Sequence, residues 1–141
     1  MISENEQGAL ILGLQRAAHA TLLALSARLA DLDLKASEIN ALANMADGRS
    51  RSIGELAMET ASRPTTLTSL LDRLVRRGYV ARELDPADRR SFRVWPTDAG
   101  QPVADAARAA MGAVEDLALA AVSDADLAGF RAVVHALTEV S

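Results

Sequence analysis

Leucine and alanine recur at three- and four-residue spacing from Leu10 to Leu29, which predicts a helix over about 6–30. The same two residue types also fill much of its other surface, so the apolar face is not a single stripe. A helix that is apolar on more than one side is normally covered on more than one side. We therefore expect a second subunit to cover part of this helix.

Shorter helical segments follow, each with signals for its ends. Ser52 and Glu55 have the spacing of a capping box, and Pro64 suits the first position of a helix, where its missing N–H is not needed. Two short helices joined by a turn of a few residues form the helix-turn-helix pattern. The expected helices cover about 37–46, ended by Asp47-Gly48, about 52–59, and 64–77, ended by Gly78.

The periodicity changes from helical to alternating after Gly78. Segments 79–83 and 91–95 are expected to be strands, and 84–90 the turn between them, which makes a β-hairpin wing. Thr97 is expected to cap a long helix that runs to about 122, and Ser123 is expected to cap a last helix that runs to about 140. The expected fold class is mainly α with a small β-hairpin wing, a winged helix-turn-helix with flanking helices.

Composition limits the class of protein. The chain has 141 residues, of which 50% are hydrophobic and 24% charged, as expected for one folded domain. It contains no cysteine, which excludes disulfides, thiolate zinc sites and thiol redox chemistry. No stretch is expected to span a membrane, and the beginning, MISENEQ, is acidic where a signal peptide is basic. A cytoplasmic location follows from this interpretation.

The charge is unevenly distributed along the chain. The formal net charge is −4, yet segment 49–93 has ten arginines against six acidic residues, a local +4, and the remainder carries −8. A basic local region matters more for binding phosphates than the charge of the whole chain. A solvated charged face and a polyanion site both fit this pattern.

Helical phase divides segment 64–77 into two faces. Leucines at 67, 70, 71 and 74 share one face and are expected in the core, while hydroxyls and arginines point away. Hydroxyls can contact base edges in a major groove, and arginines hold phosphates or guanine. A generic surface helix is the alternative, although threonine is a poor helix former. The outward residues are Thr65, Ser69, Asp72, Arg73 and Arg76, with Thr66 and Thr68 on the flanks.

The wing sequence LDPADRRSFRVW runs from Leu84 to Trp95. Asp88 is expected to accept hydrogen bonds from the hairpin backbone or to pair with an arginine. Arg89 and Arg90 lie at the tip, where guanidinium groups can enter a minor groove. A charged turn that keeps a strand edge soluble is the alternative, but the position directly after a helix-turn-helix favours DNA.

Residues 56–100 resemble the winged-helix core of the MarR family of bacterial transcriptional regulators, in Leu56-Ala57, LTSLLDRLVRRGYV, DPADRR and the final T-x-A-G. The resemblance implies homodimers whose first, fifth and sixth helices intertwine. It also implies repression from palindromic operators and release by a small aromatic or phenolic ligand. It divides the single domain 1–141 into a DNA-binding lobe, 35–96, and a dimerisation region, 1–34 and 97–141. The implied DNA-binding residues are Arg63, Thr65, Thr66, Thr68, Ser69 and Arg73 on the recognition helix and Asp88, Arg89 and Arg90 on the wing.

Some residues depart from the family pattern. Lys35 stands where a capping threonine is usual, so Asp33 or Ser37 is expected to cap instead. Ser69 replaces a common arginine, which is expected to alter base readout. Pro96 replaces a leucine, removes a ladder donor and is expected to shorten the second wing strand.

The remaining polar residues give little indication of a metal, cofactor or catalytic site. His19 and His135 are too few for a zinc site and are interpreted as interface or surface histidines, so no metal or cofactor is expected. Arg16 and His19 are candidates to line a pocket for an acidic ligand. No nucleophile-base pair or carboxylate motif suggests an enzyme.

The function expected is a sequence-specific DNA-binding regulator, a repressor released by a ligand. The alternative is a dimeric winged-helix module that binds protein or acts as an anti-repressor without operator binding.

Overall fold

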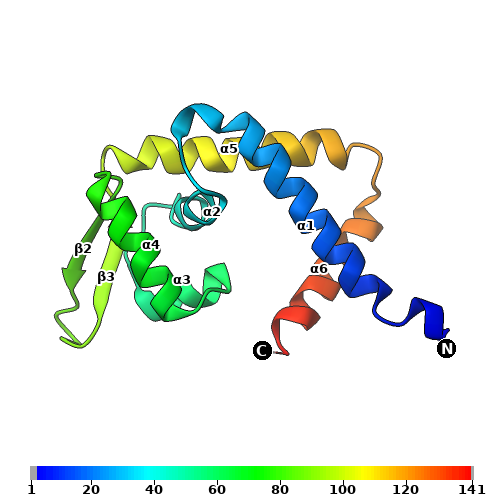
Figure 1. Ribbon diagram of the computed structural model, residues 1–141, viewed down its shortest axis with the longest axis horizontal. Helices are drawn as coiled ribbons and strands as arrows, with labels where there is room; N and C mark the ends of the chain where they lie inside the picture. Colours follow the sequence, from blue (N-terminus) through cyan, green and yellow to red (C-terminus); the bar gives the residue numbers. More distant parts are fainter. Residues whose placement is uncertain (1–2, 141) are drawn as a thin grey trace.

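The computed structural model describes residues 3–140, in which helices precede and follow a winged helix-turn-helix lobe in the sequence (Figure 1). The long helix α5 runs from the lobe, which holds α2, α3, α4 and the strands, to the end where α1 and α6 lie. The elements are η1 (Glu4–Glu6), α1 (Ala9–Arg28), η2 (Ala30–Leu32), α2 (Ala36–Asn44), β1 (Arg51–Ser52), α3 (Ile53–Thr60), α4 (Pro64–Arg76), β2 (Val80–Leu84), β3 (Phe92–Pro96), α5 (Gly100–Ala118) and α6 (Asp124–Thr138).

The wing is part of an antiparallel sheet with strand order β1-β3-β2. The two predicted strands are present, each shifted by one residue, and the two-residue strand β1 was not predicted. The expectation that Pro96 shortens its strand was wrong, because Pro96 pairs with Val80. The next ladder bond is donated by the Thr97 N–H to the Tyr79 carbonyl at 3.0 Å, so pairing continues without a proline donor.

The core of the lobe forms around the leucine face of α4. Leu67, Leu70, Leu71 and Leu74 are buried together with residues of α2, α3 and the sheet, which confirms the predicted helical phase. A second cluster contains Leu29, Ile39, Ala43 and Ala107 and joins the end of α1 to α2 and α5. These two clusters fix α4 and α5 relative to α2.

The cap of α2 differs from the expected one. Neither Asp33 nor Ser37 caps this helix; Lys35 occupies the N-cap position, and its backbone N–H donates to the Glu38 carboxylate at 3.3 Å. Asp33 adopts a left-handed conformation with φ of 50°, and its carbonyl oxygen accepts from Arg77. The Glu38 carboxylate performs the capping because it sits three residues into the helix.

Other predicted caps are present. The Ser52 hydroxyl accepts from the Glu55 N–H at 3.1 Å, and the Ser123 hydroxyl accepts from the Asp126 N–H at 3.1 Å. The Thr97 hydroxyl accepts from the Gly100 N–H at 3.0 Å, at the beginning of α5. α5 ends at Ala118, earlier than expected, and α6 begins at Asp124.

Helices α1 and α6 are hardly buried in the single chain. Leu25 is the buried residue of α1, and α6 has none over its length. The helical segment Glu4–Arg28 has a mean hydropathy of 1.3 and is long and apolar enough to cross a membrane, so the expectation that no stretch reaches this level was wrong. Leucine and alanine on all sides of α1 raise its hydropathy. Residues 1, 2 and 141 of the expected dimerisation region lie outside the described residues.

A close backbone contact joins α5 to the start of β2. A Cβ placed on Gly100 would lie 1.8 Å from the Tyr79 carbonyl oxygen. Gly100→Ala should therefore lower the free energy of unfolding by about 2 kcal/mol or more, since a backbone clash forces the two elements apart. Gly112→Ala in the same helix is the control, because a Cβ there meets nothing within 4 Å. Chemical denaturation that gave equal stabilities for the two variants would contradict this contact.

Candidate nucleic-acid interface

The exposed face of α4 carries the hydroxyls that the sequence assigned to it. Thr65, Thr66, Thr68 and Ser69 are all exposed, next to the buried leucine face. The Thr68 hydroxyl donates to the Pro64 carbonyl at 2.9 Å, which leaves its oxygen lone pairs for an outside donor. The outward side chains near the beginning of α4 are thus short and polar.

The turn between α3 and α4 presents the beginning of α4 to solvent. Ala61 has a left-handed φ of 50°, and the Ser62 N–H donates to the Ala57 carbonyl at 3.0 Å, which ends α3 sharply. Arg63 is the N-cap of α4 and makes no side-chain capping bond. Free N–H groups at a helix beginning attract anions such as phosphate.

Arg73 lies further along α4 but is held from within the lobe. Its Nε atom is 3.9 Å from the Glu38 carboxylate, which is only 4% exposed as a residue. The Arg73 Nε atom is itself buried and makes no hydrogen bond among the described residues. The Glu38 carboxylate therefore attracts Arg73 from within the lobe without a hydrogen bond to its Nε atom, so that this arginine is partly a structural residue.

The turn of the wing, residues 85–91, is shaped by two aspartates. The Asp85 carboxylate accepts from the Ala87 N–H at 2.9 Å, and the Asp88 carboxylate accepts from the Arg90 N–H at 3.0 Å. Of the two roles expected for Asp88, bonding to the hairpin backbone is the one present. These bonds fix the turn, and Arg89 and Arg90 are exposed at its tip.

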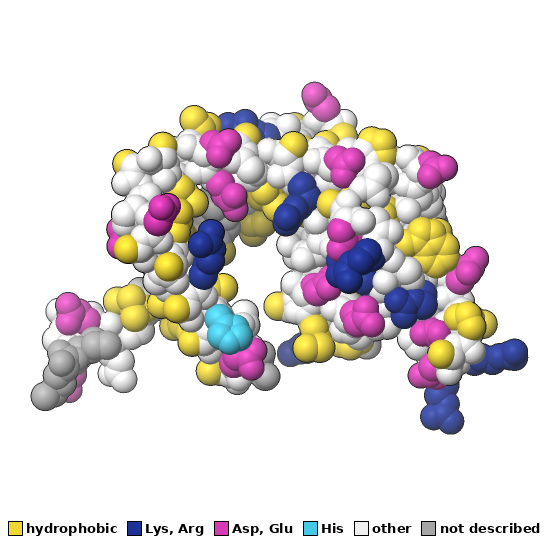
Figure 2. Space-filling model, turned by 180° about the vertical axis from the view of Figure 1, so that it is seen from behind, with side chains coloured by type: hydrophobic (Ala, Val, Ile, Leu, Met, Phe, Trp, Pro, Cys, Tyr) yellow, Lys and Arg dark blue, Asp and Glu magenta, His cyan; other side chains and the backbone are white. Residues whose placement is uncertain are grey.

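The wing and α4 form one continuous surface. Thr68 and Arg90 line a hollow of about 250 Å³ between the helix and the wing. Figure 2 shows dark-blue basic side chains projecting from this end of the molecule. Among the described residues, the arginines of segment 49–93 whose side chains make no hydrogen bond or ion pair are Arg63, Arg76, Arg89 and Arg90.

The other six arginines of this segment make hydrogen bonds or ion pairs within the protein. Arg82 pairs with Asp72 at 2.5 Å, and Arg93 bonds to the Ser50 hydroxyl at 2.7 Å. Arg77 donates to backbone carbonyls beyond the end of α1. Local net charge therefore overstated the charge available to an anion, because sequence alone does not separate structural from free arginines. Arg49, Arg51 and Arg73 complete this group.

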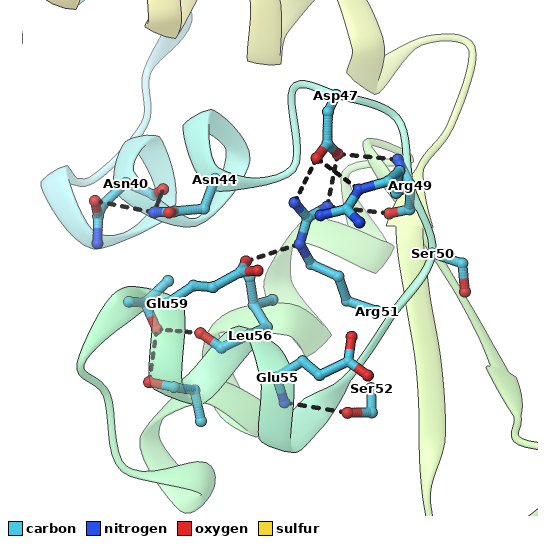
Figure 3. A network of polar contacts seen from close by, with 12 residues as sticks. Asn40, Asn44, Asp47, Arg49, Ser50, Arg51, Ser52, Glu55, Leu56 and Glu59 are labelled. Atoms are coloured by element: carbon cyan, nitrogen blue, oxygen red, sulfur yellow. Dashed lines mark hydrogen bonds and ion pairs between the residues drawn. The ribbon is translucent and has the colours of Figure 1, made fainter.

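A buried arginine organises the base of the wing (Figure 3). Arg51, in β1, is 4% exposed and donates to both oxygens of Asp47 at 2.7 Å. Its Nε atom donates to Glu59 of α3 at 2.7 Å, and it also donates to the Arg49 carbonyl at 3.2 Å. The network ties the loop after α2, β1 and the end of α3 together.

The network changes the acidity of its members. Hydrogen bonding by Arg51 lowers the pKa of the Asp47 carboxyl well below its ordinary range, with smaller contributions from Arg49. Hydrogen bonding to Asp47 in turn raises the pKa of the Arg51 guanidinium. Both partners remain charged at neutral pH. Sequence analysis missed this network, for which the only sequence signal is the close spacing of Asp47, Arg49 and Arg51.

A cleft of about 320 Å³ lies between α1, α2 and α5, away from the wing. Most of its lining is apolar, with Leu25, Ile39 and Met111 among the lining residues. Arg16 and His19, the candidates for an acid pocket, do not line this cleft in the single chain. Among residues 3–140, no group of three or more histidine and acidic side chains is placed to hold a metal ion.

Comparison with known proteins identifies transcriptional regulators as relatives. Residues 32–91 match the profile of the MarR family. The uncharacterized HTH-type transcriptional regulator YcgE of Bacillus subtilis (strain 168) is 38% identical over 69 residues. This match covers 49% of the chain and 42% of the relative, so the chain matches less than half the length of this curated protein.

Solved structures share the fold over nearly the whole chain. A MarR-family transcriptional regulator from Silicibacter pomeroyi is 27% identical, with a TM-score of 0.78 over 93% of this chain and 88% of that chain. NadR in complex with 4-hydroxyphenylacetate has a TM-score of 0.85 and covers 100% of both chains at 16% identity, a likeness of fold alone. The winged helix-turn-helix fold expected from the sequence is confirmed, and the relatives from Bacillus subtilis and Silicibacter pomeroyi are both described as transcriptional regulators.

The Arg51 network should make stability depend on pH in the acid range. Because the pKa of Asp47 is lower in the folded protein, its contribution to stability is complete above the unfolded pKa, about 3.9, and is lost as the pH falls further. Urea unfolding of Asp47→Asn should show lower stability at pH 7 than the parent and a smaller further loss from pH 5 to 3. Glu83→Gln is the control, since its carboxylate has no bonding partner among the described residues. An unchanged pH profile in Asp47→Asn would contradict the assignment.

Proposed function

Because the chain belongs to the MarR family of transcriptional regulators, we propose that it is a sequence-specific repressor which a small-molecule ligand releases from operator DNA. The observation that carries this proposal is the continuous surface of exposed hydroxyls on α4 and free arginines on the wing. The two parts suit two different grooves of one duplex.

The major groove is the proposed site of α4. An α-helix fits this groove, and short hydroxyls can reach base edges and thymine methyl groups. Arg63 and the free N–H groups at the beginning of α4 would hold a phosphate and set the register of the helix. The proposed readers of base identity are Thr65, Thr66, Thr68 and Ser69. Arg73, held by Glu38, would contribute from the edge of this surface.

The minor groove is the proposed site of the wing. Arg89 and Arg90 are exposed, and the protein leaves both guanidinium groups without partners among the described residues. Narrow minor grooves attract such groups through their negative potential. Asp88 would act indirectly, because its carboxylate holds the Arg90 backbone in the turn.

A homodimer is the proposed active form, with the helices of 1–34 and 97–141 forming the interface around two DNA-binding lobes, 35–96. Leu10 is 76% exposed and Phe130 is 58% exposed, at an apolar groove of about 440 Å³ between α1 and α6. A second copy would bury this surface.

A membrane is the less suitable partner for α1, because Arg16 at its centre would cost about 2.5–3.5 kcal/mol in the middle of a bilayer. A cytoplasmic location accords with this proposal.

The α1–α2–α5 cleft is the proposed effector site. Its volume falls in the range of small-molecule pockets, and its lining is largely apolar. The structurally similar NadR binds 4-hydroxyphenylacetate, a single-ring compound of a size that suits such a cleft. A module that binds only protein remains the second candidate function, and it requires no role for the free arginines of the wing tip.

Dimerisation should depend on the exposed side chains of α1 and α6. Val133→Asp places a charge in the apolar groove of each protomer, so the dimer dissociation constant should rise by about tenfold or more. Sedimentation equilibrium without detergent measures this constant. Met58→Asp is the control, because Met58 is equally apolar and 85% exposed but belongs to α3. A monomeric parent at micromolar concentration would contradict the proposal.

The affinity for DNA should depend on salt in part through the arginines of the wing, because they neutralise phosphate charges. An operator is first selected from random duplexes, and a pseudo-palindrome with half-sites about 10 base pairs apart is expected from a two-fold dimer. Arg90→Ala removes two charges per dimer, and each neutralised phosphate contributes about 0.9 to the salt slope of log K. The variant should bind more weakly, with a slope reduced by about one to two.

The control for this experiment is Arg28→Ala, an equal loss of charge in the last turn of α1. It should leave the salt slope unchanged. If Arg90→Ala bound as tightly as the parent at every salt concentration, the wing would be a soluble turn without a DNA contact. If the parent selected no duplex at all, the protein-binding module would be the better interpretation.

A further inference from the structure

The α1–α2–α5 cleft carries an acidic side chain and no basic one among its described lining residues. Glu115 of α5 is the charged residue in its lining, and the remaining polar groups are the side chains of Thr21, Ser26 and Asn40. Among the described residues, the lining contains no lysine, arginine or histidine. Within one chain, a carboxylate ligand would therefore find an acidic neighbour and no cationic partner here.

Basic side chains on the neighbouring helices lie outside this lining. Arg131 of α6 lines a second cleft, which Glu115 also borders. Arg108, about one turn before Met111 on α5, lines a different cleft together with Asp47 and Glu59. Arg16 and His19 lie on α1 before the part of the helix that borders the cleft. The Glu115 carboxylate makes no hydrogen bond or ion pair within the described residues, so its charge is available to a ligand.

The hydrogen-bonding groups of the cleft, like the Glu115 carboxylate, favour a ligand that carries a cationic donor. The Thr21 hydroxyl donates to the Ala18 carbonyl at 2.8 Å, so towards the cleft its oxygen is an acceptor. The Asn40 side-chain oxygen accepts from Asn44 at 3.4 Å, which leaves the Asn40 amide N–H groups as donors. The cleft thus offers acceptors at Glu115 and Thr21 for an ammonium group, and a donor at Asn40 for a hydroxyl or carbonyl oxygen.

We propose that the effector bound in this cleft is a small cationic aromatic molecule, an amine on an apolar ring, with its ammonium group at the Glu115 carboxylate. The ring would lie against Leu25, Ile39 and Met111. A volume of about 320 Å³ admits a molecule of one or two rings. The release of DNA by this ligand rests on the proposed function, but ligand binding itself does not.

The test uses three phenols that share a ring and differ in charge: tyramine, the neutral alcohol tyrosol, and 4-hydroxyphenylacetate. Binding to the full-length protein without DNA is measured by calorimetry and by the shift in Tm. Tyramine should bind about five- to thirtyfold more tightly than the acid, since attraction and repulsion at a partly exposed carboxylate add. Glu115→Gln should remove most of this preference while the binding of tyrosol stays unchanged.

Two further variants locate the site, because Glu115 also borders a second cleft between α5 and α6. Ser26→Trp fills the α1–α2–α5 cleft from the exposed face of α1 and should abolish tyramine binding. Ala120→Trp fills the second cleft and should leave tyramine binding intact. Asp116→Asn, in that second cleft, is the charge-matched control for Glu115→Gln.

The proposal is overturned if the acid binds as tightly as the amine, if Glu115→Gln keeps the preference, or if none of the three phenols binds at millimolar concentration. It is also overturned if Ala120→Trp abolishes binding and Ser26→Trp does not. Operator binding by the unliganded protein is measured separately. A protein that binds operator but not tyramine retains the proposed function and loses only this inference.

Discussion

Burial of the leucine face of α4 is the constraint that determines which side chains the protein offers to its surroundings. Leu67, Leu71 and Leu74 are completely buried, and burying each contributes about 1.5–3 kcal/mol. A rotation of α4 by one residue, about 100°, would expose part of this face. The hydroxyls of Thr65 and Ser69 are therefore held outward by the packing of the opposite face, whatever they contact.

Electrostatics adds a second division, between arginines that build the lobe and arginines that remain free. Arg51 is buried, and two carboxylates and a carbonyl satisfy it. A buried charge of this kind is tolerated only with such partners. Arg89 and Arg90, in contrast, lie on a turn that aspartate side chains fix through backbone bonds, and their guanidinium groups are unpaired among the described residues. A chain with a net charge of −4 can in this way present a basic tip.

The features that the sequence predicted well are local ones. The phase of α4, the caps at Ser52, Thr97 and Ser123 and the hairpin follow from residues within a few positions of one another. The features that it missed join distant segments. Strand β1 is too short to show alternation, and the partners of Arg51 and Arg73 depend on how α2 and α3 pack. The roles of the nine DNA-binding candidates stay predictions, because their exposure and contacts do not identify a ligand.

Helix α2 is the element that the two proposed sites share. Ile39 lines the α1–α2–α5 cleft, and the preceding residue, Glu38, faces Arg73 of α4. A ligand in the cleft would thus touch a helix that packs directly against α4, the proposed recognition helix. The pair is loose, with 3.9 Å between Nε and the carboxylate oxygen and no hydrogen bond on the buried Nε atom. A ligand can shift the position of α4 only through a difference in its contacts between two states. The Glu38–Arg73 pair joins α2 directly to α4, so a displacement of α2 by a ligand would change this contact without any intervening element.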